Sequence, residues 1–124
     1  MALKEGLTAT QTMTVTDQDT AIHHGSGKLK VYATPAMVAF MENTAIACME
    51  ADLEKGMDSV GIQIDTKHSK ATKVGEKVSC TAKISKVDGK KISFEIEASD
   101  EDGVIGSAKH MRYLIDPVKF MSRL

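Results

Sequence analysis

The chain has 124 residues, of which 42% are hydrophobic and 27% are charged. These values are typical of a globular protein and argue against a disordered chain or a membrane protein. Sixteen basic and seventeen acidic residues give a net charge of -1, so no overall positive field would draw the protein to nucleic acid or anionic lipid. We expect one domain over residues 1–124, with no nucleic-acid and no membrane partner.

Compartment and metal content can be addressed from the same bulk features. The first ten residues lack the apolar region of a secretion signal, and the most apolar stretch, Pro35 to Met49, is interrupted by Glu42, which favours the cytoplasm. Cys48 and Cys80 lie in apolar segments, without a His or Cys at zinc-ligand spacing. We expect both cysteines in the core, no metal, and no cofactor.

The N-terminal part predicts one strand and one loop. Leu7 to Val15 alternates apolar residues with threonines, which indicates a strand at the edge of a sheet. The polar stretch from Asp17 to Lys30 contains two adjacent histidines and the Gly25-Ser26-Gly27 triplet, a composition typical of a mobile loop.

A long helix follows this loop. Thr34 is a favourable N-cap residue and Pro35 suits the first helical position, and apolar residues then recur at helical spacing. Gly56 is a stop signal, so the pattern predicts a helix that runs to about Lys55.

The second half of the chain reads as four antiparallel strands. Val60 to His68 alternates with Val60, Ile62, Ile64, Thr66 and His68 on one face, and a hairpin turns at Asp88-Gly89. Asp102-Gly103 precedes a last strand from Val104 to Ile115, and a short amphipathic tail begins at Pro117. An α+β fold follows, in which the long helix packs on one face of a curved antiparallel sheet of about five strands.

Glu42 is the leading candidate for chemistry. Its neighbours three and four positions away, Val38, Ala39, Ala45 and Ile46, are all apolar, so a carboxylate is expected within the buried stripe of the helix. Burying an ionised carboxylate costs several kcal/mol unless it has a partner. Glu42 is therefore either a structural residue bonded to a buried group or a functional residue.

Two further features could act together with this carboxylate. His68 continues the apolar face of its strand and could point towards the helix. The start of the helix, at Thr34, offers free backbone N–H groups and the positive end of the helix dipole to a developing oxyanion. Each feature alone is commonly structural, and only their combination indicates catalysis.

Lysines gather near both ends of the strands. One cluster surrounds the turn after His68 and another surrounds the hairpin, and such clusters either lie in solvent or bind phosphates. Lys70, in the first cluster, is our candidate ligand for the phosphates of coenzyme A.

Three stretches together resemble the fluoroacetyl-CoA thioesterase family of hotdog-fold proteins: Val31 to Glu42, Ser59 to His68, and Gly106 to Arg112. The resemblance implies a hotdog fold and a catalytic set that falls on Thr34, Glu42 and His68. It also implies an acyl-pocket role for Gly61 and a coenzyme-associated role for Arg112. By the same resemblance the protein is a homodimer, or a tetramer, with sites at the interface, and the family's longer aromatic segment before the helix is missing here.

The resemblance implies hydrolysis of a short acyl-CoA to a free acid and CoA. Glu42 would attack the thioester carbonyl or activate water, His68 would act as acid and base, and Thr34 would orient or stabilise the oxyanion. One alternative is a non-catalytic acyl-CoA binding module in which Glu42 and His68 bond each other. The other is an enoyl-CoA hydratase, against which Ala47 argues because the related hydratases carry a histidine at that helix position.

Overall fold

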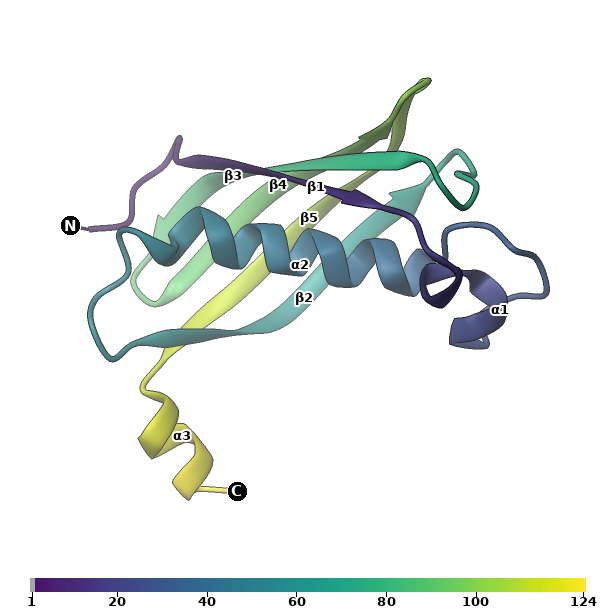
Figure 1. Cartoon of the computed structure of the whole chain (residues 1–124). Helices are drawn as coiled ribbons and strands as arrows, with labels where there is room; N and C mark the ends of the chain where they lie inside the picture. The colour runs from purple at the N-terminus through teal and green to yellow at the C-terminus, as the bar shows by residue number, and fades with distance from the viewer. Residues whose placement is uncertain (1) are drawn as a thin grey trace.

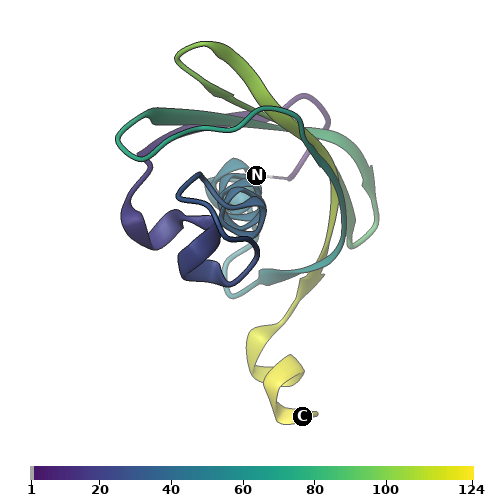
Figure 2. The same cartoon turned by 90° about the vertical axis from the view of Figure 1, so that its right-hand side faces the viewer.

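The computed structural model describes residues 2–124, and its centre is a helix wrapped by a curved sheet. Five antiparallel strands lie in the order β1-β3-β4-β5-β2, and they curl around helix α2 when the molecule is viewed along the helix (Figures 1 and 2). The elements are β1 (Thr8–Thr14), α1 (Ala21–His24), α2 (Thr34–Glu50), β2 (Asp58–His68), β3 (Lys77–Asp88), β4 (Lys91–Asp100), β5 (Gly103–Ile115) and α3 (Pro117–Ser122). The predicted α+β architecture is confirmed.

The core lies between α2 and the concave face of the sheet. Met37 and Met41 on α2 are fully buried, and burial of such a side chain contributes about 1.5–3 kcal/mol. The strict alternation of β3 and β4 buries Val78, Cys80, Ala82, Ile84, Ile92, Phe94, Ile96 and Ala98 against them. Cys48 and Cys80 are both free and buried, as expected.

Helix α2 differs from the prediction at both ends. Its N-cap is Ala33, and Thr34 is already helical, so the Thr34 side chain makes no capping bond. The helix ends at Glu50 and not near Lys55. Ala51 is its C-cap, Asp52, a weak helix former, comes next, and Gly56 adopts a φ of +84° before β2.

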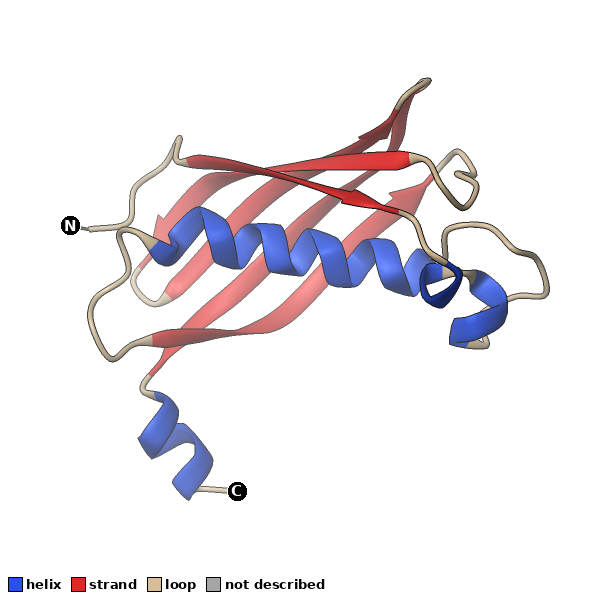
Figure 3. Ribbon diagram, viewed as in Figure 1, coloured by secondary structure: helices blue, strands red, loops and turns tan. Residues whose placement is uncertain are grey.

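The segment from Asp17 to Lys30 is more ordered than the expected mobile loop (Figure 3). Thr16 and Asp19 form a capping box around a short 3-10 turn, Asp17–Asp19. The Thr20 side chain then caps α1 by accepting from the His23 N–H, and Gly25 ends this helix with a φ of +69°. Local side-chain bonds thus help to order a polar sequence, and Ala21 packs against the core.

Strand β2 contains a bulge that changes which residues face the helix. Gly61 pairs with Arg112 and Gln63 pairs with Met111, so Ile62 is an extra residue and its side chain is 51% exposed. The prediction that Val60 to His68 share one inward face is therefore wrong for the residues before the bulge. A bulge reverses the alternation, so Gly61 faces inward on one side of it and Ile64, Thr66 and His68 do so on the other.

The sheet ends at β1 on one side and at β2 on the other. β1 pairs only with β3, as an edge strand should, and β2 pairs only with β5. Among residues 2–124, no helix is both long enough and apolar enough to cross a membrane.

Candidate active site

The structure brings Thr34 and His68 together. Thr34 opens α2 and His68 ends β2, and Thr34 Oγ1 lies 2.8 Å from His68 Nδ1. The first turn of a helix leaves backbone N–H groups without intrahelical partners and carries the positive end of the helix dipole. Thr34 and Ala36 can supply such groups, whereas Pro35 cannot. A hydroxyl, an imidazole and the start of a helix thus meet at one point.

His68 is held so that one ring nitrogen is free to act. Its Nε2 atom is buried and has no hydrogen-bond partner among the described residues. Burial of the ring lowers the pKa of His68, although the Lys70 backbone acts in the opposite direction. The imidazole is therefore neutral at physiological pH and able to accept a proton. It lines a pocket of about 280 Å³, together with Ala21, Ser26, Val31, Tyr32, Ala33, Thr34, Ser69, Lys70 and Ala71.

Glu42 lies at the border of the buried stripe and not within it. Its side chain is 37% exposed, because the buried side of α2 is centred on Met37, Met41 and Ala45. It stands eight positions beyond Thr34, a distance of about 12 Å along the helix axis. Within one chain Glu42 therefore does not join the Thr34–His68 pair, contrary to the expected meeting of Glu42 and His68.

The partner of Glu42 is Arg112. Its Nη1 lies 3.6 Å from Glu42 Oε2, and the guanidinium is fixed by bonds from Nε to Ser59 Oγ (2.8 Å) and from Nη2 to the Ser59 carbonyl (3.1 Å). Arg112 is only 5% exposed. The structure thus places it beneath the glutamate, and its expected role towards coenzyme A stays a prediction.

Gly61 gives this ion pair its space. A Cβ atom at position 61 would lie 2.6 Å from Glu42 Oε2 and 3.2 Å from Arg112 Nη1, well inside van der Waals contact. The expected acyl-pocket role of Gly61 is untested. What its geometry establishes is that the backbone of β2 approaches the glutamate closely.

His110 is a site residue that the sequence interpretation missed. It is 2% exposed, and its Nε2 lies 3.2 Å from Arg112 Nη1 and 3.9 Å from Glu42 Oε2. The available signal was the alternation of Ala108, His110 and Arg112 on the last strand, all of which face inward. A histidine two positions from an arginine on a buried face would have indicated a polar network.

Lys70 lines the His68 pocket, but its charge is already paired. Its Nζ lies 2.6 Å from Asp100 Oδ2 and 3.7 Å from Asp102 Oδ2. Burial of the Asp100 side chain would raise its pKa, yet hydrogen bonds from Lys70 and Thr72 lower that pKa to about 2. Glu76 joins the two aspartates in an acidic cluster, where the Lys70 ammonium occupies the place a cation would take. Phosphate binding by Lys70 stays a prediction.

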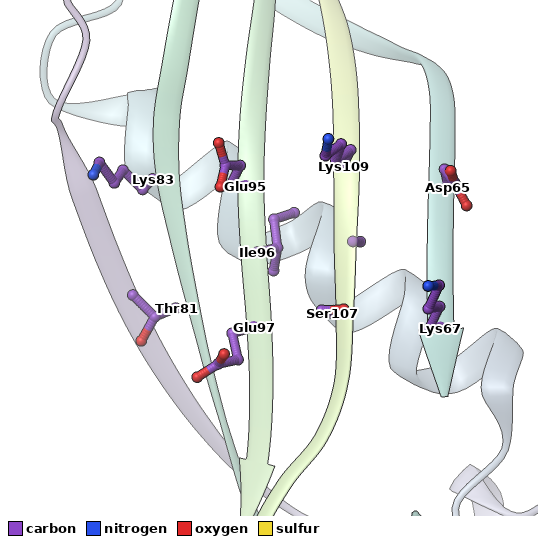
Figure 4. A pocket seen from close by; sticks show the side chains of 10 residues that line it. Asp65, Lys67, Thr81, Lys83, Glu95, Ile96, Glu97, Ser107 and Lys109 are labelled. Carbon is purple, nitrogen blue, oxygen red and sulfur yellow. The ribbon is translucent and has the colours of Figure 1, made fainter. Parts of the chain in front are cut away.

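A wider hollow than the His68 pocket lies elsewhere, on the outer face of the sheet. It measures about 750 Å³, and Figure 4 shows charged side chains across it. The register places Lys83, Glu95, Lys109 and Asp65 in one row across four strands. Alternating charges in a row stabilise a solvated face, and the hollow contains neither the Thr34–His68 pair nor Glu42.

Comparisons with known proteins identify the family of this chain. The family described as FlK, fluoroacetyl-CoA-specific thioesterase, matches residues 15–118. The fluoroacetyl-CoA thioesterase of Streptantibioticus cattleyicolor is 36% identical over 95 residues, which span 77% of this chain and 68% of the relative. The chain belongs to the fluoroacetyl-CoA thioesterase family. This membership confirms the expectation of an acyl-CoA thioesterase.

Solved structures agree with the family. A mutant of the fluoroacetyl-CoA-specific thioesterase FlK, in complex with fluoroacetate and CoA, matches with a TM-score of 0.87 and 31% identity over 95% of this chain and 99% of that one. A hot-dog-like protein from Thermanaerovibrio acidaminovorans matches with a TM-score of 0.88 at 19% identity, over 98% of this chain and 90% of that one. The predicted hotdog fold is confirmed. The roles of the individual residues are not tested by these similarities.

Proposed function

We propose that this member of the fluoroacetyl-CoA thioesterase family hydrolyses a short acyl-CoA in a homodimer, with each active site shared between two copies. Thr34 and His68 of one copy and Glu42 of the other would form the catalytic set. The supporting observation is the separation within one chain, where Thr34 bonds His68 while Glu42 stands about two turns further along the helix.

The free edge of β2 supports such a dimer. This strand has no neighbour on its outer side, and an exposed strand edge is a template for pairing with a second chain. In an antiparallel pairing of two β2 strands, one register sets His68 of one copy opposite Gly61 of the other. Because Gly61 faces Glu42, this register carries the carboxylate of the second copy to the Thr34–His68 pair.

The chemistry follows from these positions. Glu42 either attacks the thioester carbonyl to form an anhydride that water hydrolyses, or it removes a proton from the attacking water. The N–H groups at the start of α2 stabilise the negative carbonyl oxygen, and Thr34 orients His68. His68, neutral at the outset, accepts a proton released from the water, directly or by way of Glu42, and passes it to the CoA thiolate, so that it ends the cycle neutral. No metal and no cofactor is needed in this scheme.

Pocket size supports a short acyl group. The pocket beside His68 holds about 280 Å³, which is slightly below the range of roughly 300–1,000 Å³ that drug-sized ligands occupy. A group of two to four carbons fits this space. Acyl-CoA esters are intracellular metabolites, and the two free cysteines suit a reducing compartment, so we propose the cytoplasm.

A non-catalytic acyl-CoA binding module is the alternative, and one observation favours it. Glu42 is already ion-paired with Arg112, as a structural carboxylate would be. The two functions differ in a single measurable property, which is the release of free thiol.

The deciding experiment is a thiol-release screen over acetyl-, fluoroacetyl-, butyryl- and octanoyl-CoA with three proteins. The wild type should turn over the short esters, Glu42→Gln should lose about a hundredfold or more in kcat/KM, and Glu50→Gln, an exposed glutamate on the same helix, should retain activity. Saturable binding of every ester without thiol release would establish the binding module. Equal activity of Glu42→Gln and wild type would remove Glu42 from the mechanism.

A further inference from the structure

The hydrogen bonds of His110 fix its tautomer. Its Nδ1 lies 2.7 Å from the backbone carbonyl oxygen of Gln63, which can only accept, so Nδ1 carries a proton and donates it. Burial lowers the pKa of His110, and this effect together with the Arg112 charge outweighs the Gln63 carbonyl and Glu42. The ring is therefore neutral, and its Nε2 bears a lone pair.

That lone pair is directed at Arg112. Nε2 lies 3.2 Å from Arg112 Nη1, which carries only donors, so the imidazole accepts from the guanidinium. A protonated His110 would instead set an N–H group against an N–H group. Together with Ser59, which receives bonds from Nε and Nη2, His110 gives each of the three guanidinium nitrogens an acceptor.

This arrangement determines where the charge of Arg112 stands. The guanidinium is held from β2 by Ser59 and from its own strand by His110, and Nη1 is left 3.6 Å from Glu42 Oε2. The 3.6 Å separation is an ion pair without a short hydrogen bond, so Glu42 does not itself fix the arginine. The ring of His110 is in turn supported by Phe94, whose ring centroid lies 6.0 Å away.

We propose that His110 is a positioning residue: it acts as a neutral hydrogen-bond acceptor that holds Arg112 against Glu42 and so fixes the carboxylate for its attack on the thioester. The role in attack rests on the proposed function, whereas the hold on Arg112 does not. A carboxylate whose counter-ion is free to rotate loses its orientation, and catalysis depends on placement more strongly than binding does.

Three variants test the proposal. His110→Leu removes the acceptor, His110→Gln keeps a side-chain acceptor at similar reach, and Val78→Ala removes two methyl groups from another part of the core without touching His110. We expect His110→Leu to lower kcat by about tenfold or more with KM changed by less than about twofold, and His110→Gln to recover most of that loss. Val78→Ala should lower the melting temperature and leave kcat near the wild-type value.

A readout independent of activity accompanies the kinetics. In nitrogen-15 NMR spectra, His110 should appear as the Nδ1–H tautomer, and the Arg112 Nη1–H protons, which His110 accepts, should give a sharp, slowly exchanging signal in wild type and His110→Gln but not in His110→Leu. Equal loss of kcat in both His110 variants, unchanged kcat in His110→Leu, or an Nε2–H tautomer would overturn the proposal. If wild type cleaves no thioester, the proposed function fails, and the Arg112 signal still decides whether His110 holds the guanidinium.

Discussion

Gly61 and Glu42 face each other across the space between β2 and α2, and only the absence of a side chain at position 61 lets the carboxylate lie where it does. A Cβ atom there would stand 2.6 Å from Glu42 Oε2. The backbone of Gly61 does not have a positive φ, so alanine would not strain the chain itself. The constraint is one of space alone.

Gly61→Ala should therefore displace Glu42 and reduce activity while the fold persists. We expect kcat/KM to fall by about tenfold to a hundredfold, since small misplacements of a reacting group carry losses of this order. Far-UV circular dichroism and the melting temperature report the fold, and thiol release reports activity. Ile62→Ala, at the neighbouring exposed position, is the control. An active Gly61→Ala protein would show that the position of Glu42 is not critical.

Mixed dimers should reveal whether the active site is shared. His68→Ala and Glu42→Gln are each expected to be inactive alone. Because the mixed dimer contains one site with both wild-type residues, co-refolding equal amounts should restore about one quarter of wild-type activity for random pairing. Thiol release measured before and after co-refolding is the assay. Mass spectrometry should show that mixed dimers have formed. If they have formed and activity does not recover, the active site is not shared between the two chains.

The pH at which kcat/KM begins to fall on the acid side should be low. His68 must be neutral to accept a proton, and burial lowers its pKa below the ordinary value of 6.5. As the pH falls, kcat/KM should therefore be maintained through pH 6.5 and decline only below it. A pH series of thiol release with a short acyl-CoA measures this decline. A half-maximal point above pH 6.5 would contradict a burial-lowered His68.

A pair of histidine variants tests whether His68 is specifically required for activity. His68→Ala should lose about a hundredfold in kcat/KM, whereas His23→Ala, in the exposed helix α1, should keep it. Both proteins should retain the wild-type melting temperature within a few degrees, because neither ring belongs to the hydrophobic core. A common loss in the two variants would indicate an effect that is not specific to His68.

The Lys70–Asp100 pair should make stability depend on acid pH. The pKa of Asp100 lies at about 2 in the folded protein and near 3.8 in the unfolded chain, so its contribution is present above pH 4 and is lost as the pH falls towards 2. Asp100→Asn should lower the melting temperature at pH 7 by on the order of a few degrees, and this difference should shrink towards pH 2. Asp102→Asn, whose carboxylate is exposed and 3.7 Å from Lys70, should have less effect.

Much of the fold could be predicted because its signals are local. The Thr34-Pro35 start and the period-two patterns of β3 and β4 depend only on neighbouring residues; both strand patterns appear as expected, and the helix begins one residue earlier than predicted. Two local predictions were wrong for a local reason as well. The helix ends at Glu50, with Ala51 as its C-cap, before the stop signal at Gly56, and the Thr16–Asp19 capping box orders a segment whose composition is typical of a mobile loop.

The site was predicted less completely because its contacts are not local. Thr34 and His68 were expected together and are in contact, but the network of Glu42, Arg112 and His110 depends on the register between β2 and β5. That register is shifted by the bulge at Ile62, and nothing in a plain alternating sequence indicates an extra residue. Only a pairing of known strands shows that Gly61 lies opposite Arg112.

The Ile62 side chain does not contact the site, yet the site depends on the extra residue that Ile62 adds to β2. Deleting this one residue would restore a regular strand and force a choice: either Ser59 and Gly61 turn away from the helix, or His68 turns away from Thr34. Homologues that keep the thioester chemistry should therefore tolerate almost any residue at this position but no deletion. Selection at position 62 would thus preserve the number of residues in β2 and not the type of residue.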